Sequence, residues 1–407
     1  MLVFRTLKMH LFDQVSPAPA DPILGLSDTF RADPRPDKIN LTVGVYQDES
    51  GKVPALRSVA EAEQRLTKTE RNRSYLPISG LPAFNEKVQA LAFGEGSLLL
   101  GTGRIASIQT PGGTGALRVA AEFLAQILGK RTIWVSKPTW SNHPAIFARA
   151  GFEIKDYPYF DADHHGLQRE GFLDALKAIP QGDVVLLHAC CHNPTGVDPS
   201  PEDWKAIAEI CAERALVAVL DFAYQGFDRG LAEDTTAVQA FAAADQEFFV
   251  ASSFSKNFGL YQERTGALHV VADNSQAASR VLSQIQVIVR TMYSNPPAHG
   301  AHVVATILNS TELRAQWESE VAGMRNRIRE MRELFVANLK AAGIDQDFGF
   351  LLEQNGMFSF SGLKPAEVEQ LREAHGVYMI GNGRINVAGI TENNVERLCQ
   401  AVAKVLS

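Results

Sequence analysis

The chain of 407 residues has few cysteines and no long apolar run. No stretch of about 18 or more apolar residues occurs, so the sequence predicts no transmembrane helix. None of the four cysteines has the C-x-x-C spacing of a metal or redox site; they are Cys190, Cys191, Cys211 and Cys399. We interpret them as core thiols in a reducing compartment, and expect a cytoplasmic protein without a membrane partner.

An excess of positive charge is also missing. The formal net charge is −7, and both signs are scattered along the chain. A nucleic-acid-binding surface needs a basic stripe, so no nucleic-acid partner is expected. His164 and His165 lie in a polar stretch that is typical of a solvated turn, and no metal site is predicted.

The N-terminal segment resembles neither a signal peptide nor a regular domain. It lacks a clear apolar h-region and a small-residue cleavage site. Met1 and Met9 remain alternative starts of the chain. The first fifty residues are rich in proline and aspartate, and we expect little secondary structure in them.

The middle of the chain alternates short apolar runs with segments of helical period such as Pro201 to Arg214. The runs that we expect to form strands are 105–110, 131–135, 183–188, 216–220, 248–251 and 265–271. The last run follows its predecessor so closely that it is expected to be antiparallel. The alternation indicates an α/β domain with a mostly parallel sheet.

The C-terminal third has a different pattern. Residues 310–345 predict one long helix or two, and short alternating segments follow at 356–360 and 383–388. These features indicate a smaller α+β domain. The expected division is an N-terminal arm at 1–20, a small domain at 21–54 and 324–407, and a large domain at 55–323.

Chemically distinctive residues follow the apolar runs, where doubly wound sheets bind their ligands. A glycine-rich stretch at 111–118 opens a helical segment and is typical of an anion site. Asn193, Asp221 and Lys256 each follow a further run. Taken alone, the glycine stretch is also typical of a plain turn before a helix, and Asn193 and Lys256 are more typical of an ordinary Asn-Pro turn and of a surface lysine whose stem snorkels. A carboxylate such as Asp221 at the end of a buried strand usually has a cationic or hydrogen-bonding partner.

Together, the strand ends meet the needs of pyridoxal phosphate. Its phosphate needs glycine, threonine or serine donors and an arginine, for which Arg264 is available. Its pyridine nitrogen needs an acid, so that the ring acts as an electron sink. Its phenolic oxygen needs an amide or a tyrosine hydroxyl, and its aldehyde needs a lysine with a lowered pKa.

The chain resembles the class I pyridoxal-phosphate aminotransferases of the aspartate/aromatic subgroup, from about Asp21 to the C-terminus. The stretches that carry the resemblance are PGGTGALR at 111–118, CHNPTG at 191–196, DFAYQGF at 221–227, SFSKNFGLY at 253–261, YSNPPAHG at 293–300 and GRINVAG at 383–389. The resemblance implies fold type I of the pyridoxal-phosphate transferases. In that fold a seven-stranded, mostly parallel sheet lies between helices, beside a smaller α+β domain.

The resemblance also implies residue roles. The catalytic residues would be Lys256, which forms the internal aldimine and moves the proton, Asp221 and Tyr224. The cofactor-binding residues would be Gly113, Thr114, Trp140, His143, Asn193, Asp221, Ala223, Tyr224, Ser253, Lys256, Arg264 and Tyr75. The substrate-binding residues would be Gly44, Trp140, Asn193, Arg290 and Arg384. Without the resemblance, Trp140 reads as a core residue, His143 as a surface histidine and Arg290 as a helix-end cation.

Tyr75 and Arg290 would come from the neighbouring subunit, so the resemblance implies a homodimer with shared active sites. The implied reaction is a ping-pong transamination between L-aspartate and 2-oxoglutarate, giving oxaloacetate and L-glutamate. Aromatic amino acids are the alternative substrates, alone or with aspartate, and a catalytically silent binding protein is the remote alternative. Thr42, Pro77 and Ser79 depart from the family pattern and leave the substrate preference open.

Overall fold

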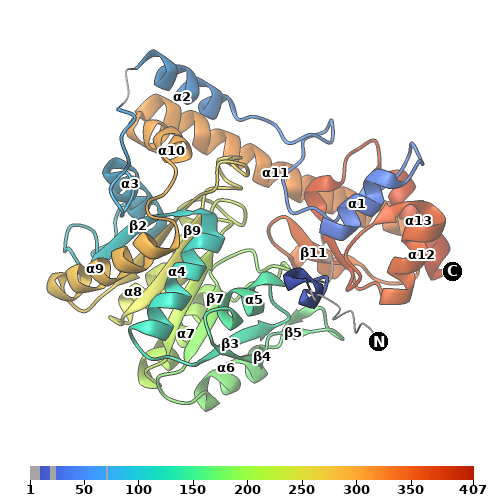
Figure 1. Cartoon of the computed structure of the whole chain (residues 1–407). Helices are drawn as coiled ribbons and strands as arrows, with labels where there is room; N and C mark the ends of the chain where they lie inside the picture. The colour runs from blue at the N-terminus through green and yellow to red at the C-terminus, as the bar shows by residue number, and fades with distance from the viewer. Residues whose placement is uncertain (1–9, 19–23, 70–71) are drawn as a thin grey trace, which may run out of the picture.

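The computed structural model describes residues 10–18, 24–69 and 72–407 (Figure 1). Met1, Met9 and part of the expected arm lie outside the described residues. Within those ranges, no helix is both long and apolar enough to cross a membrane. The same ranges contain no cluster of three or more potential metal ligands.

A seven-stranded sheet forms the centre of the molecule, as predicted. Its strands, in spatial order, are β2 (Ile105–Pro111), β10 (Thr265–Val271), β9 (Phe248–Ser253), β8 (Val217–Phe222), β7 (Val184–His188), β3 (Thr132–Lys137) and β4 (Glu153–Pro158). The prediction of an antiparallel strand at 265–271 is confirmed, because β10 runs antiparallel to both of its neighbours. The remaining pairs are parallel, so the carboxyl ends of β7, β8 and β9 meet at one edge.

Helices cover both faces of this sheet because successive strand residues point to opposite sides. Val184 and Leu186 belong to one apolar cluster, whereas Val185 and Leu187 belong to the other. The helices on the first face are α4 (Gly112–Gln126), α5 (Asn142–Ala148) and α9 (Ser275–Met292). Those on the second face are α3 (Pro82–Phe93), α6 (Arg169–Ala178), α7 (Pro201–Glu213) and α8 (Thr236–Ala243). The 3-10 turn η2 (Glu233–Thr235) directly precedes α8.

The strand β4 is absent from the sequence prediction. It is the outermost strand of the sheet, and most of its side chains are partly or fully exposed. An exposed edge strand needs no apolar run, and its sequence EIKDYP contains none. The short hairpin of β5 (Phe160–Asp161) and β6 (Gly166–Leu167) follows it and contains the turn predicted at His164.

One long helix, α11 (Thr311–Ala341), connects the sheet region to the C-terminal elements (Figure 1). Two small sheets lie there: β11 (Phe358–Phe360) pairs with β13 (Arg384–Asn386), and β1 (Ile39–Asn40) pairs with β12 (Val377–Tyr378). The other elements of this region are α1 (Leu24–Ala32), α12 (Pro365–His375), α13 (Val395–Leu406), η3 (Gly349–Glu353) and η4 (Val387–Gly389). The pairing of β1 with β12 ties the N-terminal segment to the C-terminal one.

The remaining helices are η1 (Leu11–Gln14), α2 (Arg57–Lys68) and α10 (His299–Asn309). The expectation of little structure in the first fifty residues is wrong for α1, a helix of nine residues. The acids and prolines that suggested a loop flank this helix, and its own sequence LGLSDTFRA has helical spacing of apolar residues.

Candidate active site

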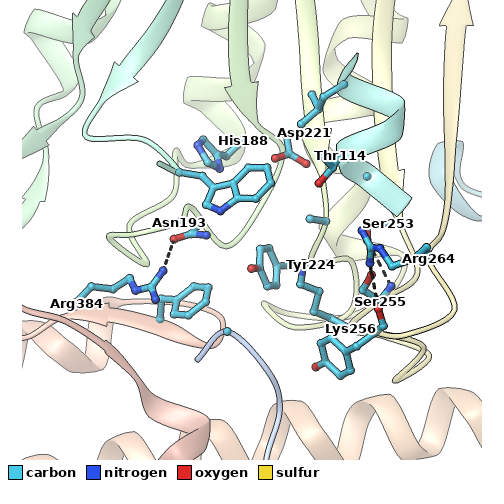
Figure 2. Close-up of a pocket in the computed structure, with 17 residues that line it drawn as sticks. Thr114, His188, Asn193, Asp221, Tyr224, Ser253, Ser255, Lys256, Arg264 and Arg384 are labelled. Carbon is cyan, nitrogen blue, oxygen red and sulfur yellow. Dashed lines mark hydrogen bonds between the residues drawn. The ribbon is translucent and has the colours of Figure 1, made fainter. Parts of the chain in front are cut away.

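A cavity of about 240 Å³ opens at the carboxyl ends of the central strands, between the sheet and the C-terminal elements (Figure 2). Predicted site residues dominate its lining: Gly44, Gly113, Thr114, Trp140, Asn193, Asp221, Ala223, Tyr224, Ser253, Lys256, Arg264 and Arg384. These residues come from segments separated by up to about 340 positions, and the fold brings them to one place.

One end of the cavity is built to hold an anion. The helix α4 begins at Gly112, whose φ of +71° is in the left-handed region that favours glycine. A Cβ atom at Gly112 would lie 2.4 Å from Nη2 of Arg264, so glycine lets the guanidinium approach the helix N-terminus. The N–H groups of the first turn, the hydroxyl groups of Thr114 and Ser253, and this guanidinium could together hold an anion.

Hydrogen bonds hold Arg264 at this position. Its Nη1 donates to Oγ of Ser255 at 3.2 Å and to the carbonyl oxygen of Tyr261 at 3.1 Å. The hydroxyl of Ser253 donates to Oγ of Ser255 at 3.2 Å. No carboxylate in the described part of the chain pairs with Arg264, which leaves its charge available to an anionic ligand.

Asp221 provides a buried negative charge in the middle of the cavity. Its Oδ2 lies 2.8 Å from Nε2 of His143, a fully buried histidine that stands behind the cavity wall. Burial alone would raise the pKa of Asp221, but the hydrogen bond and charge of His143, with the charge of Lys256, hold it below its usual value. The carboxylate is therefore ionised at neutral pH and suits a protonated ring nitrogen.

Two further histidine contacts stabilise this arrangement. The hydroxyl of Thr139 lies 2.8 Å from Nδ1 of His143 and 3.1 Å from Nε2 of His188. Burial lowers the pKa of His188 to about 3, so this ring is neutral and adds no charge beside the carboxylate. The interpretation of His143 as a surface histidine is thus wrong.

Lys256 follows β9 and faces the ring of Tyr224, with its Nζ 4.8 Å from the ring centroid. Burial lowers the pKa of Lys256 to about 8; the charge of Asp221 opposes this shift and that of Arg264 adds to it. An amine with this pKa is neutral in a sizeable fraction at physiological pH, as a nucleophile or proton carrier requires. The interpretation of Lys256 as a snorkelling surface lysine is wrong.

Arg384 is a buried cation without an acidic partner among the residues that the structure describes. It is 4% exposed, and burial lowers the pKa of its guanidinium to about 10, so it stays charged at neutral pH. Its Nη2 donates to the carbonyl oxygen of Thr42 at 2.6 Å and its Nη1 to Oδ1 of Asn193 at 3.4 Å. Its Nε is buried and has no hydrogen-bond partner. A buried, charged guanidinium with an unpaired N–H group can bind a carboxylate.

Asn193 and Tyr224 lie between Asp221 and Arg384 in the cavity (Figure 2). The peptide bond between Asn193 and Pro194 is cis, and the side chain of Asn193 is buried. Burial raises the pKa of Tyr224, so its phenol keeps its proton and can donate a hydrogen bond. An amide and a phenol in this place can bind a ligand oxygen.

Two predicted residues do not reach this cavity. Tyr75 is 91% exposed, and Arg290 lies exposed in the last turn of α9, where its Nη1 donates to Oγ of Ser294. Neither of them lines the cavity of its own chain. Their assignment to a neighbouring subunit stays a prediction.

The cavity also contains residues that the sequence analysis missed: Leu117, His188, Ser255, Tyr261 and Phe358. Two of these carried a local signal, since His188 ends a predicted strand and Ser255 directly precedes Lys256. His188 pairs in register with Asp221 across β7 and β8. Tyr261 and Phe358 reach the cavity from segments whose packing no local pattern reveals.

Comparison with known proteins gives a consistent result. Residues 36–402 match the family model for aminotransferases of class I and II. The chain is 52% identical over 396 residues to aspartate aminotransferase from Escherichia coli (strain K12), covering 97% of this chain and 100% of that one. It is 49% identical over 397 residues to aromatic-amino-acid aminotransferase from Pseudomonas aeruginosa, covering 98% of this chain and 99% of that one.

The fold is similar to solved structures along its whole length. An aromatic-amino-acid aminotransferase from Burkholderia pseudomallei, covalently bound to pyridoxal phosphate, superposes with a TM-score of 0.96 at 49% identity. The match covers 98% of this chain and 100% of that chain. An aspartate aminotransferase from the cytoplasm of Saccharomyces cerevisiae superposes with a TM-score of 0.95 at 37% identity, over 97% of this chain and 98% of that one.

Proposed function

The chain belongs to the class I and II aminotransferases, and from this premise we propose that it transfers the amino group of L-aspartate to 2-oxoglutarate. The products are oxaloacetate and L-glutamate, and pyridoxal phosphate is the resident cofactor. The observation that carries the proposal is one cavity that holds both Lys256, with its lowered pKa, and Arg384, a buried guanidinium without an acid. A reactive amine and a guanidinium that can bind a carboxylate, both in one cavity, suit an α-amino acid as the substrate.

The donor set of the cavity fits pyridoxal phosphate. Gly113, Thr114, Ser253 and Arg264 would hold the phosphate at the N-terminus of α4, in the cradle that a Cβ atom at Gly112 would fill. Asp221, ionised and supported by His143, would face the pyridine nitrogen. The remaining contacts would be made by Asn193 and Tyr224 to the phenolic oxygen, and by Trp140 and Ala223 to the two ring faces.

Arg384, Lys256 and Asp221 have different roles in the proposed reaction. Pyridoxal phosphate, when bound through Lys256, supplies an electron sink for the charge that develops at the substrate Cα. Arg384 holds the substrate α-carboxylate with its guanidinium fork and so fixes the orientation of Cα. The neutral Nζ of Lys256 would take the proton from Cα of the amino donor. In the second half of the reaction, it would return a proton to Cα of the amino acid that is formed. Asp221, whose pKa is lowered, would hold a proton on the ring nitrogen of the cofactor.

We further propose that the enzyme is a cytoplasmic homodimer whose active sites are shared. Tyr75 and Arg290 are exposed in the single chain, as residues that serve a neighbouring site would be. In this arrangement, Tyr75 of the partner subunit would join the phosphate contacts. Arg290 of the partner subunit would bind the distal carboxylate of aspartate. The domains would be 55–323 on one side and 21–54 with 324–407 on the other, preceded by the arm 1–20.

A second candidate function is aromatic amino acid transamination, alone or beside aspartate. The observation that favours it is the similarity at 49% identity to proteins named for aromatic amino acids. The test is to measure kcat/KM for aspartate and phenylalanine with 2-oxoglutarate as the acceptor. We expect aspartate to be the better substrate. A preference for phenylalanine would replace the first proposal with the second. The absence of both turnover and an absorption change on adding amino acid would favour a silent binding protein.

A further inference from the structure

A second polar cavity, of about 270 Å³, lies outside the active site between α11 and the segment 352–356. We call it the α11 cavity, and it is lined by Phe227, Asp228, Arg325, Ile328, Arg329, Arg332, Glu333, Leu352, Gln354, Asn355 and Gly356. Its volume is slightly below the range of roughly 300–1,000 Å³ that is usual for small-molecule sites. The space suits a small metabolite.

Of the four charged residues that α11 contributes to the cavity, three are arginines and the fourth is Glu333. Arg325, Arg329 and Arg332 lie on the same face of α11, because residues three and four positions apart share a face. Arg332 is 5% exposed and is engaged with the carbonyl oxygen of Gly356 at 2.6 Å and Oγ of Ser359 at 3.3 Å. Arg325 donates to the carbonyl oxygen of Gly226 at 3.0 Å.

Arg329 differs from its two neighbours. It is exposed at the mouth of the cavity, and it has no hydrogen-bond or ion-pair partner among the described residues. Its five N–H donors are therefore free to bind an anionic group. The fixed charges of Arg325 and Arg332 beside it reinforce the attraction for such a group.

The opposite wall presents acceptors. Gln354 is 2% exposed, and its Oε1 is buried without any hydrogen-bond partner, whereas its Nε2 donates to the carbonyl oxygen of Phe360 at 3.4 Å. An unpaired buried acceptor costs about 1–3 kcal/mol, which a donor from a ligand in the cavity would recover. Asp228 adds a half-buried carboxylate whose Oδ2 lies 3.5 Å from Nε of Arg229.

From this polarity we propose that the α11 cavity binds a small zwitterion, an α-amino acid, at a site distinct from the active site. The carboxylate of the ligand binds Arg329, beside Arg325 and Arg332. Its ammonium group donates to Oε1 of Gln354 and to the carboxylate of Asp228. An anion alone would leave Oε1 of Gln354 unpaired, and a cation alone would lie against three arginines.

The α11 cavity adjoins the machinery of the active site. The backbone N–H of Asn355 donates to the carbonyl oxygen of Gly196 at 2.6 Å, in the loop that carries Asn193. A Cβ atom at Gly356 would lie 2.5 Å from Cβ of Cys191, so the two segments are in close contact. A ligand bound to Gln354 therefore rests against the segment that supports Asn193.

Crystallography of the holoenzyme soaked in increasing glycine tests this proposal, because glycine is the smallest zwitterion and its position is observed directly. We expect glycine to occupy the α11 cavity in the wild type, with its carboxylate on Arg329. Arg329→Gln should need at least about tenfold more glycine for half occupancy, since it loses a charge-assisted pair. Arg280→Gln, the same change at an exposed arginine of α9 outside the cavity, should bind glycine like the wild type.

Parallel soaks test whether the cavity needs both charges of the zwitterion or only one of them. Acetate and methylammonium should each reach a lower occupancy than glycine at the same concentration, and Asp228→Asn should reduce the preference for glycine over acetate. Water alone in the wild-type cavity, or equal glycine occupancy in Arg329→Gln, would overturn the site. Acetate occupancy equal to that of glycine would overturn the ligand class. None of these outcomes depends on whether aspartate is the substrate of the active site.

Discussion

The carboxylate of Asp221 lies 2.8 Å from Nε2 of His143, and both side chains are buried, Asp221 in the wall of the cavity and His143 behind it. This contact lets a carboxylate stay ionised where burial alone would favour its protonated form. It also fixes the direction in which the other oxygen of Asp221 can face a ligand. The electrostatics of the cofactor site therefore depend on a histidine that does not itself line the cavity.

Replacing Asp221 with asparagine keeps the shape of the side chain and removes its charge. We expect kcat/KM to fall by at least about a hundredfold, because loss of a buried charged partner costs about 3 kcal/mol or more and each 1.36 kcal/mol is tenfold. His143→Asn should have a smaller effect, since it leaves the carboxylate in place. Steady-state kinetics of the two variants check this order. A larger loss in His143→Asn than in Asp221→Asn would contradict the assigned roles.

Lys256→Met should abolish turnover and yet stabilise the cofactor-free protein at neutral pH. The pKa of Lys256 falls from 10.5 to about 8 on burial, so the unfolded chain binds more protons between these values. The destabilisation of the wild type by its buried ammonium group is complete below pH 8, and it disappears as the pH rises to about 10.5. Allowing for partial exposure of the side chain to the cavity, we expect a gain on the order of 2 kcal/mol at pH 7.

Urea unfolding at several pH values measures this gain. Lys205→Met is the matched control, because the side chain of Lys205 is 77% exposed on α7 and its ammonium is solvated. A gain in Lys256→Met that persists unchanged at pH 10.5 would show that packing, and not the buried charge, is responsible.

The sequence predicted the strand ends because each combines two local signals, an apolar run and a polar or charged residue that comes after it. Asp221 directly follows the apolar run at 216–220 and lies near the end of β8, and Lys256 comes three residues after the end of β9. A parallel sheet then brings those ends together without any further information. The family resemblance added Trp140 and His143, whose neighbouring residues alone suggested neither role.

The rest of the site depends on contacts between distant segments. Arg384 donates to the carbonyl oxygen of Thr42, 342 positions away, and no local pattern encodes this pairing. The backbone N–H of Tyr46 similarly donates to the hydroxyl oxygen of Tyr261 at 2.8 Å, across 215 positions of the chain. Such contacts follow from tertiary packing, and the same is true of the edge strand β4, whose exposed side chains need no apolar run.

Gly112→Ala should weaken cofactor binding by about tenfold or more. Its Cβ atom would lie 2.4 Å from Nη2 of Arg264 and would push the guanidinium away from the anion site. Gly129→Ala is a matched control, because Gly129 also has a positive φ, of 65°, but open space around its Cβ position. Both variants should lose about 1–2 kcal/mol of stability from the left-handed backbone. Only Gly112→Ala should raise the Kd for pyridoxal phosphate; an equal effect of both would refute the steric argument.

Arg384→Lys should reduce kcat/KM for amino acids by about a hundredfold. Lysine keeps a positive charge but cannot make the two parallel hydrogen bonds of a guanidinium to a carboxylate, which are worth roughly 1.5–3 kcal/mol each. The loss should appear largely in KM if the contact holds substrate and transition state equally. Arg65→Lys, at a partly exposed arginine of α2, should leave the kinetics unchanged. Wild-type kcat/KM for amino acids in Arg384→Lys would show that Arg384 does not bind the substrate carboxylate.

The proposed sharing of active sites between two subunits predicts complementation. Lys256→Ala and Arg290→Ala should each lack aspartate transamination, because each damages both sites of its homodimer. In a mixed dimer, one site combines Lys256 of one subunit with Arg290 of the other and is therefore intact. Random reassociation after mild unfolding should restore about a quarter of wild-type activity, since half of the dimers are mixed and each has one intact site. Recovery of no activity from the mixture, with dimers verified by sedimentation, would place Arg290 outside the neighbouring site.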